Sequence, residues 1–223
     1  MNSAKKILKS FVSPVVLATA LTFGAGNSHA EDSKINSPLK SNEQPKVRLV
    51  EKGFLGAYGY GDVKNQKTDD PYELGSVMMR FGWDIKPFVE DKLHLHPKGK
   101  LTGLVEPFAS AVESPDSNFE VGLNLLAKYN FRKENKKPVG LLDRVDPYLE
   151  GGFGAIYASQ GFKYQSTKTN FLVQLGAGID YYLNDDFSVF AGVRRRHFSN
   201  AKIKQPNRGV DINQIIAGIS YRF

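Results

Sequence analysis

From Val47 onward, apolar and polar residues alternate with a period of two along much of the chain. The longest example covers residues 119–131, in which apolar residues occupy every second position. These residues are Phe119, Val121, Leu123, Leu125, Ala127, Tyr129 and Phe131. Because successive side chains of a β-strand point to opposite faces, the pattern predicts a strand with one apolar and one mostly polar face.

The same alternation recurs in other segments, so that the chain holds eight candidate strands. The others lie near residues 54–60, 77–83, 104–112, 145–157, 171–183, 187–200 and 211–223. Within 104–112, the apolar residues Leu104, Phe108 and Val112 share their parity with Glu106 and Ser110. The sequence therefore leaves open which face of that strand is apolar. An even number of strands suits a small closed antiparallel barrel.

Alternation of this kind occurs in soluble sheets and in the walls of transmembrane barrels. Here the apolar faces recur at about the length of a barrel strand, without a second apolar layer to pack on. Aromatic residues gather at strand ends, as interfacial girdles require. After residue 30, no run of eighteen apolar residues predicts a spanning helix. The pattern predicts an all-β, eight-stranded antiparallel transmembrane β-barrel over residues 47–223.

Residues 1–30 have the composition of a secretory signal peptide. Three lysines precede an apolar run over residues 11–23, and Ser28 and Ala30 stand at the small-residue positions before a cleavage site. Removing this segment lowers the formal net charge from +7 to +4, which suits an anionic surface or an ordinary solvated one. Residues 31–46 are rich in Ser, Asn, Pro and Lys and are expected to form a flexible tail. Without cysteine, the chain has no disulfide framework.

The expected connections between strands differ in length. Residues 184–186 form a short turn, whereas 158–170 and 200–210 are longer. With both termini in the periplasm, the short turn falls inside and the two longer loops fall outside. The segments 84–100 and 132–144 are long where inner turns should be short. Each carries Lys and Pro and is expected to lie on the inner membrane surface.

One stretch near the end of the chain combines a base, a hydroxyl group and a carboxylate, in His197, Ser199 and Asp211. His197 and Ser199 share one face of a predicted strand, and Asp211 can reach that face from the next strand. A nucleophile, a base and an acid that orients the base are the groups of a serine hydrolase. For His197 and Ser199 alone, a chance pair at a strand end is the simpler explanation.

Parity places all three residues on the lipid-facing side. Counting in twos back from Phe223 reaches Asp211, and counting forward from Phe187 reaches Ser199, in both cases through mostly apolar residues. About twelve residues with a rise of about 3.3 Å and a tilt of about 40° climb on the order of 30 Å, which brings Asp211 to the outer rim of the apolar band. Such polar residues are either ordinary strand ends or a site for a lipid whose ester lies just below its headgroup.

The same stretch resembles the motif of the lipid A 3-O-deacylases of the PagL type, which is His-x-Ser-Asn at a strand end, a Pro-Asn-x-Gly turn and an acid. Here it reads His197-Phe198-Ser199-Asn200, Pro206-Asn207-Arg208-Gly209 and Asp211. The barrel plan of the family covers the chain from about Val47. The terminal Phe223 resembles the end of bacterial outer-membrane barrels, which their assembly machinery reads. The resemblance implies an outer-membrane location with the site facing the outer leaflet.

The resemblance also implies a role for each residue. Ser199 attacks the ester carbonyl, His197 takes its proton, and Asp211 holds the imidazole in the correct tautomer. Asn200 is the expected oxyanion donor. The family usually has glutamate in place of Asp211, so the shorter acid is expected to need a closer strand approach or a water bridge.

Three neighbouring residues have supporting roles in this interpretation. Asn207 is expected to shape the loop, and Gly209 to permit the turn. Arg195 shares the lipid-facing parity and is a candidate for binding a lipid A phosphate, although a role as an ordinary girdle charge is equally open. His94 and His96 have no obvious carboxylate or cysteine partner, so a solvated loop is expected there rather than a metal site.

The implied activity is that of an outer-membrane serine esterase that removes the ester-linked 3-hydroxyacyl chain at position 3 of lipid A. It needs no metal or other cofactor, its partner is lipopolysaccharide, and no nucleic acid is involved; a homodimer is left open. One alternative is a non-enzymatic barrel, an adhesin or structural protein, in which the three residues need not share a face. Another is a lipid acyltransferase, which would need an acyl-accepting pocket within the barrel.

Overall fold

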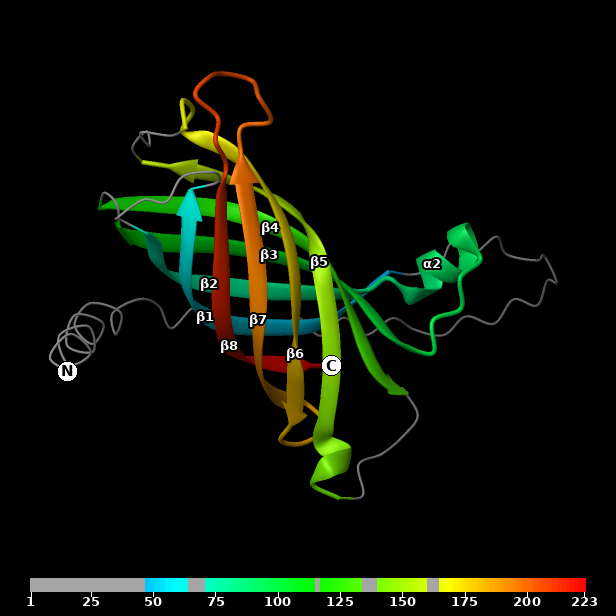
Figure 1. The fold of residues 1–223 in the computed structure, drawn as a ribbon. Helices are drawn as coiled ribbons and strands as arrows, with labels where there is room; N and C mark the ends of the chain where they lie inside the picture. The colour runs from blue at the N-terminus through cyan, green and yellow to red at the C-terminus, as the bar shows by residue number, and fades with distance from the viewer. Residues whose placement is uncertain (1–46, 64–70, 115–116, 134–139, 160–164) are drawn as a thin grey trace, which may run out of the picture. The chain divides into compact units, whose positions relative to one another are not determined.

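The computed structural model describes residues 47–63, 71–114, 117–133, 140–159 and 165–223, and the predicted signal peptide and tail lie outside them. The strands are β1 (Arg48–Val63), β2 (Tyr72–Asp84), β3 (Gly99–Ser114), β4 (Asn118–Lys133), β5 (Val145–Ala158), β6 (Thr169–Tyr182), β7 (Phe187–Ser199) and β8 (Val210–Arg222). They form a closed antiparallel barrel in sequence order, in which β8 pairs with β1 (Figure 1). The predicted eight-stranded barrel is confirmed.

As the alternation predicted, the side chains of β4 lie in turn on the outer wall and in the lumen. Phe119 and Phe131 are exposed on the outer wall, whereas Glu120, Asn124 and Lys128 are buried inside. Because alternate side chains of a barrel strand point out and in, the apolar row of β4 lies on the outer wall and its polar row lies in the lumen.

Strand β3, whose orientation the sequence left open, turns its apolar parity inward. Leu104, Phe108 and Val112 are buried in the lumen together with Glu106 and Ser110. The reason is that the lumen contains an apolar layer of its own. That layer is formed by Leu55, Tyr72, Leu74, Met78, Phe108, Val112, Tyr148, Ile156, Leu172, Phe190, Phe198, Val210, Ile212 and Ile216.

A second layer of the lumen consists of paired charges. Arg80 Nη2 lies 2.7 Å from Glu106 Oε1, and Arg194 Nη1 and Nη2 lie 2.8 Å and 2.6 Å from Glu106 Oε2 and Glu150 Oε1. All four side chains are buried. Buried charges are tolerated only when they are paired and hydrogen-bonded, as they are here. At this level the lumen is therefore occupied by ion pairs and not by an apolar cavity.

Two of the connections contain short helices. Helix α2 (Lys86–Leu93) follows β2 with a proline in its first turn, and the 3₁₀ helix η1 (Leu142–Arg144) precedes β5. The alternation analysis did not predict either helix, because each is short and buries no residue. In the described part of the chain, no helix has the length and apolarity needed to cross a membrane.

Candidate active site

His197 and Asp211 stand directly opposite each other on β7 and β8. Residues paired in this way have their Cβ atoms about 4.5–5.5 Å apart, which brings even short side chains into contact. His197 Nδ1 lies 2.7 Å from Asp211 Oδ1, at hydrogen-bonding distance. Direct pairing therefore supplies the close approach that the shorter acid was expected to need, and no water bridge is required.

The contact with Asp211 also decides which imidazole nitrogen is available. With Asp211 ionised and the imidazole neutral, Nδ1 of His197 carries the proton and donates, because an ionised carboxylate can only accept a hydrogen bond. Nε2 is then the unprotonated nitrogen of the neutral ring and can act as a base. This is the tautomer that a serine hydrolase needs.

Ser199 lies two residues beyond His197 on the same face of β7. Both residues are half-buried on the outer wall, whereas the intervening Phe198 and the following Asn200 are buried. Among the described residues, the Ser199 hydroxyl has no hydrogen-bond partner. The structure thus brings His197, Ser199 and Asp211 to one part of the outer wall, as parity predicted, and the serine hydroxyl makes no hydrogen bond with His197.

Arg195 belongs to the same cluster. Its Nη2 lies 3.4 Å from Asp211 Oδ2, so the two carboxylate oxygens face His197 and Arg195 separately. The Arg195 side chain is 63% exposed and stands two residues from His197 on the side away from the loop. It therefore lies deeper along the wall than the His197–Asp211 pair.

An open groove of about 570 Å³ runs along the outer wall beside this cluster. Arg195 and Asn213, which are cross-strand partners, lie at its end next to His197 and Asp211. Its apolar lining includes Tyr58, Tyr60, Leu149, Leu175, Val193 and Ile215. The groove thus begins beside the His197–Asp211 pair and continues over β5, β6, β7, β8 and β1.

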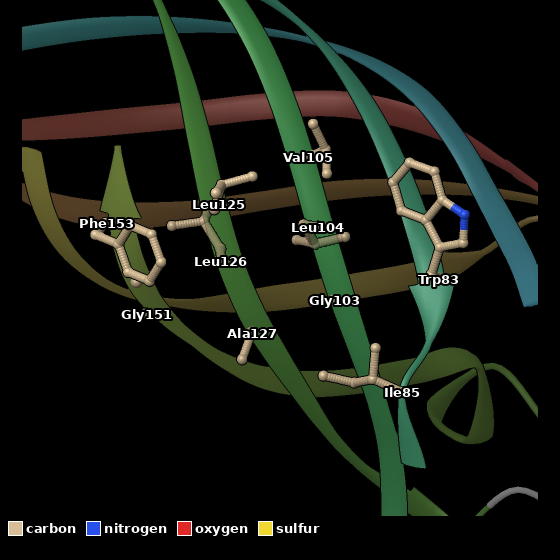
Figure 2. Close-up of a pocket in the computed structure, with 11 residues that line it drawn as sticks. Trp83, Ile85, Gly103, Leu104, Val105, Leu125, Leu126, Ala127, Gly151 and Phe153 are labelled. Carbon is tan, nitrogen blue, oxygen red and sulfur yellow. The ribbon is translucent and has the colours of Figure 1, made fainter. Parts of the chain in front are cut away.

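A second groove, of about 430 Å³, lies on the wall formed by β2 to β5 (Figure 2). Gly103, Ala127 and Gly151 are cross-strand neighbours at its floor. Figure 2 shows Trp83 and Phe153 on opposite sides of it. Its lining contains no ionisable side chain and none of the predicted site residues.

The structure does not fit the expected oxyanion role of Asn200. Its backbone N–H donates to Asn207 Oδ1 at 3.1 Å, and its side-chain Nδ2 donates to Lys204 O at 2.8 Å and to Ser166 Oγ at 3.2 Å. The side chain is fully buried. All its N–H groups are thus engaged in holding the loop, and none remains for an oxyanion.

Asn207 shapes the loop, as expected, and has a further capacity. Its Oδ1 accepts the hydrogen bond from Asn200, which fixes the orientation of the amide. Nδ2 must then point away from Asn200, and no acceptor for it is found among the described residues. Asn207 is half-buried, so this N–H₂ group can still reach a ligand.

Gly209 has a positive φ of 68°, the backbone conformation that its expected role in the turn needs. It has a second role that the sequence did not reveal. A Cβ at this position would lie 2.7 Å from His197 Cε1 and 3.3 Å from Nε2. The imidazole therefore packs against Gly209, and any residue with a Cβ at this position would force the ring to shift.

The connection between β5 and β6 contributes residues that sequence reasoning missed. Gln165 forms a bridge with Asn207, and Ser166 N donates to Pro206 O at 3.0 Å. Ser166 also accepts the hydrogen bond from Asn200. No local sequence pattern predicts these contacts, because they join two loops that are far apart in the chain.

His94 and His96 both lie in the exposed connection after α2. Within the described ranges, no three His, Asp or Glu side chains are gathered as metal ligands. The absence of a metal requirement stays a prediction.

Comparisons with known proteins identify the family of the chain and relate its fold to solved barrels. The family model described as lipid A 3-O-deacylase (PagL) matches residues 77–220. The crystal structure of the outer membrane enzyme PagL has a TM-score of 0.53 and 21% identity, over 74% of this chain and 97% of that one. The crystal structure of Neisserial surface protein A has a TM-score of 0.55 and 15% identity, over 78% and 97%. No curated protein sequence matches the chain.

At these identities, the two solved structures show a shared fold. The family match is stronger evidence, because it covers more than half of the chain and includes the stretch with His197, Ser199 and Asp211. The protein is a barrel of the bacterial outer membrane. The chain belongs to the PagL family of lipid A 3-O-deacylases.

Proposed function

We propose that this protein is an outer-membrane serine esterase that removes the ester-linked 3-hydroxyacyl chain at position 3 of lipid A. The observation that carries this proposal is the 2.7 Å contact between His197 and Asp211, beside Ser199 and at the end of an apolar wall groove. A site on the lipid-facing wall suits a substrate that is itself a lipid of the outer leaflet.

The geometry supports the following reaction. Ser199 Oγ attacks the ester carbonyl carbon while His197 Nε2 takes the hydroxyl proton. The imidazolium, stabilised by Asp211, then gives this proton to the departing sugar oxygen, which leaves the acyl group on Ser199. Water, activated by the same nitrogen, attacks the acyl-serine and releases the 3-hydroxy fatty acid. Each proton taken is returned, and no cofactor takes part.

We place the acyl chain of the substrate in the groove on the outer wall. With the ester carbonyl at Ser199, the chain can extend past Arg195 and Asn213 onto the apolar surface of Val193 and Ile215. Hydrocarbon lies equally well in this groove and in the surrounding lipid, so the groove orients the ester more than it adds affinity.

Asn207 is our candidate for the side-chain oxyanion donor, and Asn207→Asp tests it. The aspartate keeps an oxygen for the Asn200 N–H and replaces the free N–H₂ with a second oxygen. Loss of one oxyanion donor costs about 10²–10³ in kcat, so we expect at least that loss with little change in KM. Kinetics on purified protein measure it.

Asn200→Asp is the matched comparison, because it removes the donors to Lys204 and Ser166 while keeping the shape of the side chain. We expect this variant to lose thermal stability before it loses turnover. A larger fall in kcat for Asn200→Asp than for Asn207→Asp would show that Asn200, and not Asn207, is the oxyanion donor.

Two observations favour the esterase over the two alternative functions. An acyltransferase would need an acyl pocket within the barrel, but the described lumen is filled by ion pairs around Arg80 and Arg194 and by an apolar core. A non-enzymatic barrel gives no reason for a His–Asp contact beside a serine on the lipid-facing wall.

Mass spectrometry of lipid A from cells with and without the protein tests the function. We expect a species lighter by one 3-hydroxyacyl group, and the matching free acid, only in cells that carry the protein. Intact lipid A together with new lysophospholipids would show that the esterase acts on glycerophospholipids instead.

Assembly of the barrel is a further part of the proposal. Phe223 is exposed at the end of the chain, with its ring 5.8 Å from that of Tyr221. We expect the assembly machinery to read this terminal aromatic. A homodimer is not required, because His197, Ser199 and Asp211 all come from one chain.

A further inference from the structure

The loop between β7 and β8, residues 200–209, extends beyond the ends of both strands directly after Ser199 (Figure 1). Hydrogen bonds give it a defined shape. Ile203 N donates to Asn200 O at 3.0 Å, and the Asn200 side chain donates to Lys204 O at 2.8 Å. Ser166 N, from the neighbouring loop, donates to Pro206 O at 3.0 Å. These bonds therefore restrain the backbone of the loop on both sides of its tip.

This tip consists of Lys202, Ile203 and Lys204, all exposed, with Ile203 at 71%. Ala201 and Lys202 have φ values of 52° and 64°, a left-handed conformation that non-glycine residues seldom adopt. Such backbone persists only where the surroundings impose it, and it is enriched at ligand-binding positions. The loop thus holds Lys202 in an unfavourable conformation three residues after Ser199.

The charge of the loop is unbalanced. Residues 200–209 contain three cations and no acid. Neither Lys202 nor Lys204 makes an ion pair with a described residue, whereas the lumen cations Arg80, Arg194 and Arg196 are all paired. Among the described residues, the inner cations are therefore neutralised, whereas the two lysines of the loop that follows Ser199 have no counter-charge.

We propose that Lys202 and Lys204 bind the phosphate groups of the lipid headgroup whose acyl ester lies at Ser199. This inference rests on the proposed function and names a headgroup subsite for it. A lipid with its acyl chain in the groove has its headgroup on the opposite side of Ser199, where the loop lies. Ammonium groups bind phosphate as point charges, and the exposed Ile203 between them can rest against the lipid surface.

Arg195 does not fit this role, although the sequence suggested it. It lies on the groove side of His197, and its guanidinium faces Asp211. A phosphate of the headgroup would be on the other side of the ester. The headgroup subsite is thus assigned to the loop, and Arg195 to the support of Asp211.

The test compares the double variant K202Q/K204Q with wild type on lipid A that carries both phosphates and on dephosphorylated lipid A, in neutral detergent micelles. Each lysine near an anionic lipid is worth about fivefold in affinity, so KM for the phosphorylated substrate should rise about twentyfold or more. The deficit should fall below twofold on the dephosphorylated lipid. K92Q/K98Q, at the far end of the barrel, removes the same charge and should behave as wild type.

An equal deficit on both substrates, or none on either, would overturn the proposal. Binding separates this outcome from a failure of the proposed function. In the Ser199→Ala background, native mass spectrometry should show phosphorylated lipid A retained, and lost on adding K202Q/K204Q, even if no esterase activity exists. Retention of phosphatidylglycerol as strong as that of lipid A, or displacement by inorganic phosphate at similar concentrations, would contradict a lipid A headgroup subsite.

Discussion

Replacing Ser199 with alanine is expected to lower kcat for lipid A deacylation by at least about four orders of magnitude, because the acyl-enzyme route is lost with its nucleophile. The barrel should remain intact, since the hydroxyl has no hydrogen-bond partner among the described residues and its backbone pairing with Phe171 is unchanged. Release of 3-hydroxy fatty acid from lipid A in detergent micelles measures the rate.

Ser188→Ala is the matched control, because Ser188 lies on the same strand but is buried in the lumen. It should turn over as wild type. Both variants should keep the heat-modifiable migration of a folded barrel on gels. Wild-type activity in a folded Ser199→Ala protein would end the serine-esterase assignment.

Asp211→Asn is expected to lower kcat by about 10⁴, with a much smaller change in KM. The amide can donate to Nδ1 and so favour the tautomer with the proton on Nε2, which cannot accept the serine proton. The effect on kcat should be large, because residue 211 contacts Nδ1 of the imidazole directly, at 2.7 Å in the wild type. Steady-state kinetics with lipid A give kcat and KM separately.

Asp211→Glu is the companion variant and should keep activity within about tenfold of wild type. Asp211 is partly exposed on the wall, so a longer acid can bow outward and still reach Nδ1. If Asp211→Asn were as active as wild type while Ser199→Ala was dead, the site would act as a Ser–His dyad.

Much of the barrel could be predicted from the sequence, because outer-wall residues such as Phe119 and Phe131 alternate with buried polar ones. The limit was β3. Leu104 and Phe108 face an apolar layer of the lumen, and a rule that assigns apolar residues to lipid has no means of detecting such a layer. The helix α2 escaped prediction because it has no apolar periodicity directed at a core.

The candidate site could likewise be predicted only in part. Parity and the two-strand arrangement predicted that His197 and Asp211 would meet on the outer wall, and the register confirms this. The use of each amide N–H of Asn200 could not be predicted, since it depends on the fold of two loops that meet only in three dimensions. The packing of His197 on Gly209 likewise depends on coordinates and not on composition.

The groove beside the site lies along the outer wall, where its apolar lining faces the lipid. Under the proposed function, substrate would then arrive, and the shortened glycolipid and the released acid would leave, by diffusion in the plane of one leaflet. The concentration that governs the rate is the number of substrate molecules per unit of membrane area. Diluting lipid A with inert detergent at constant bulk concentration should therefore slow the enzyme, as expected of a catalyst that works in two dimensions.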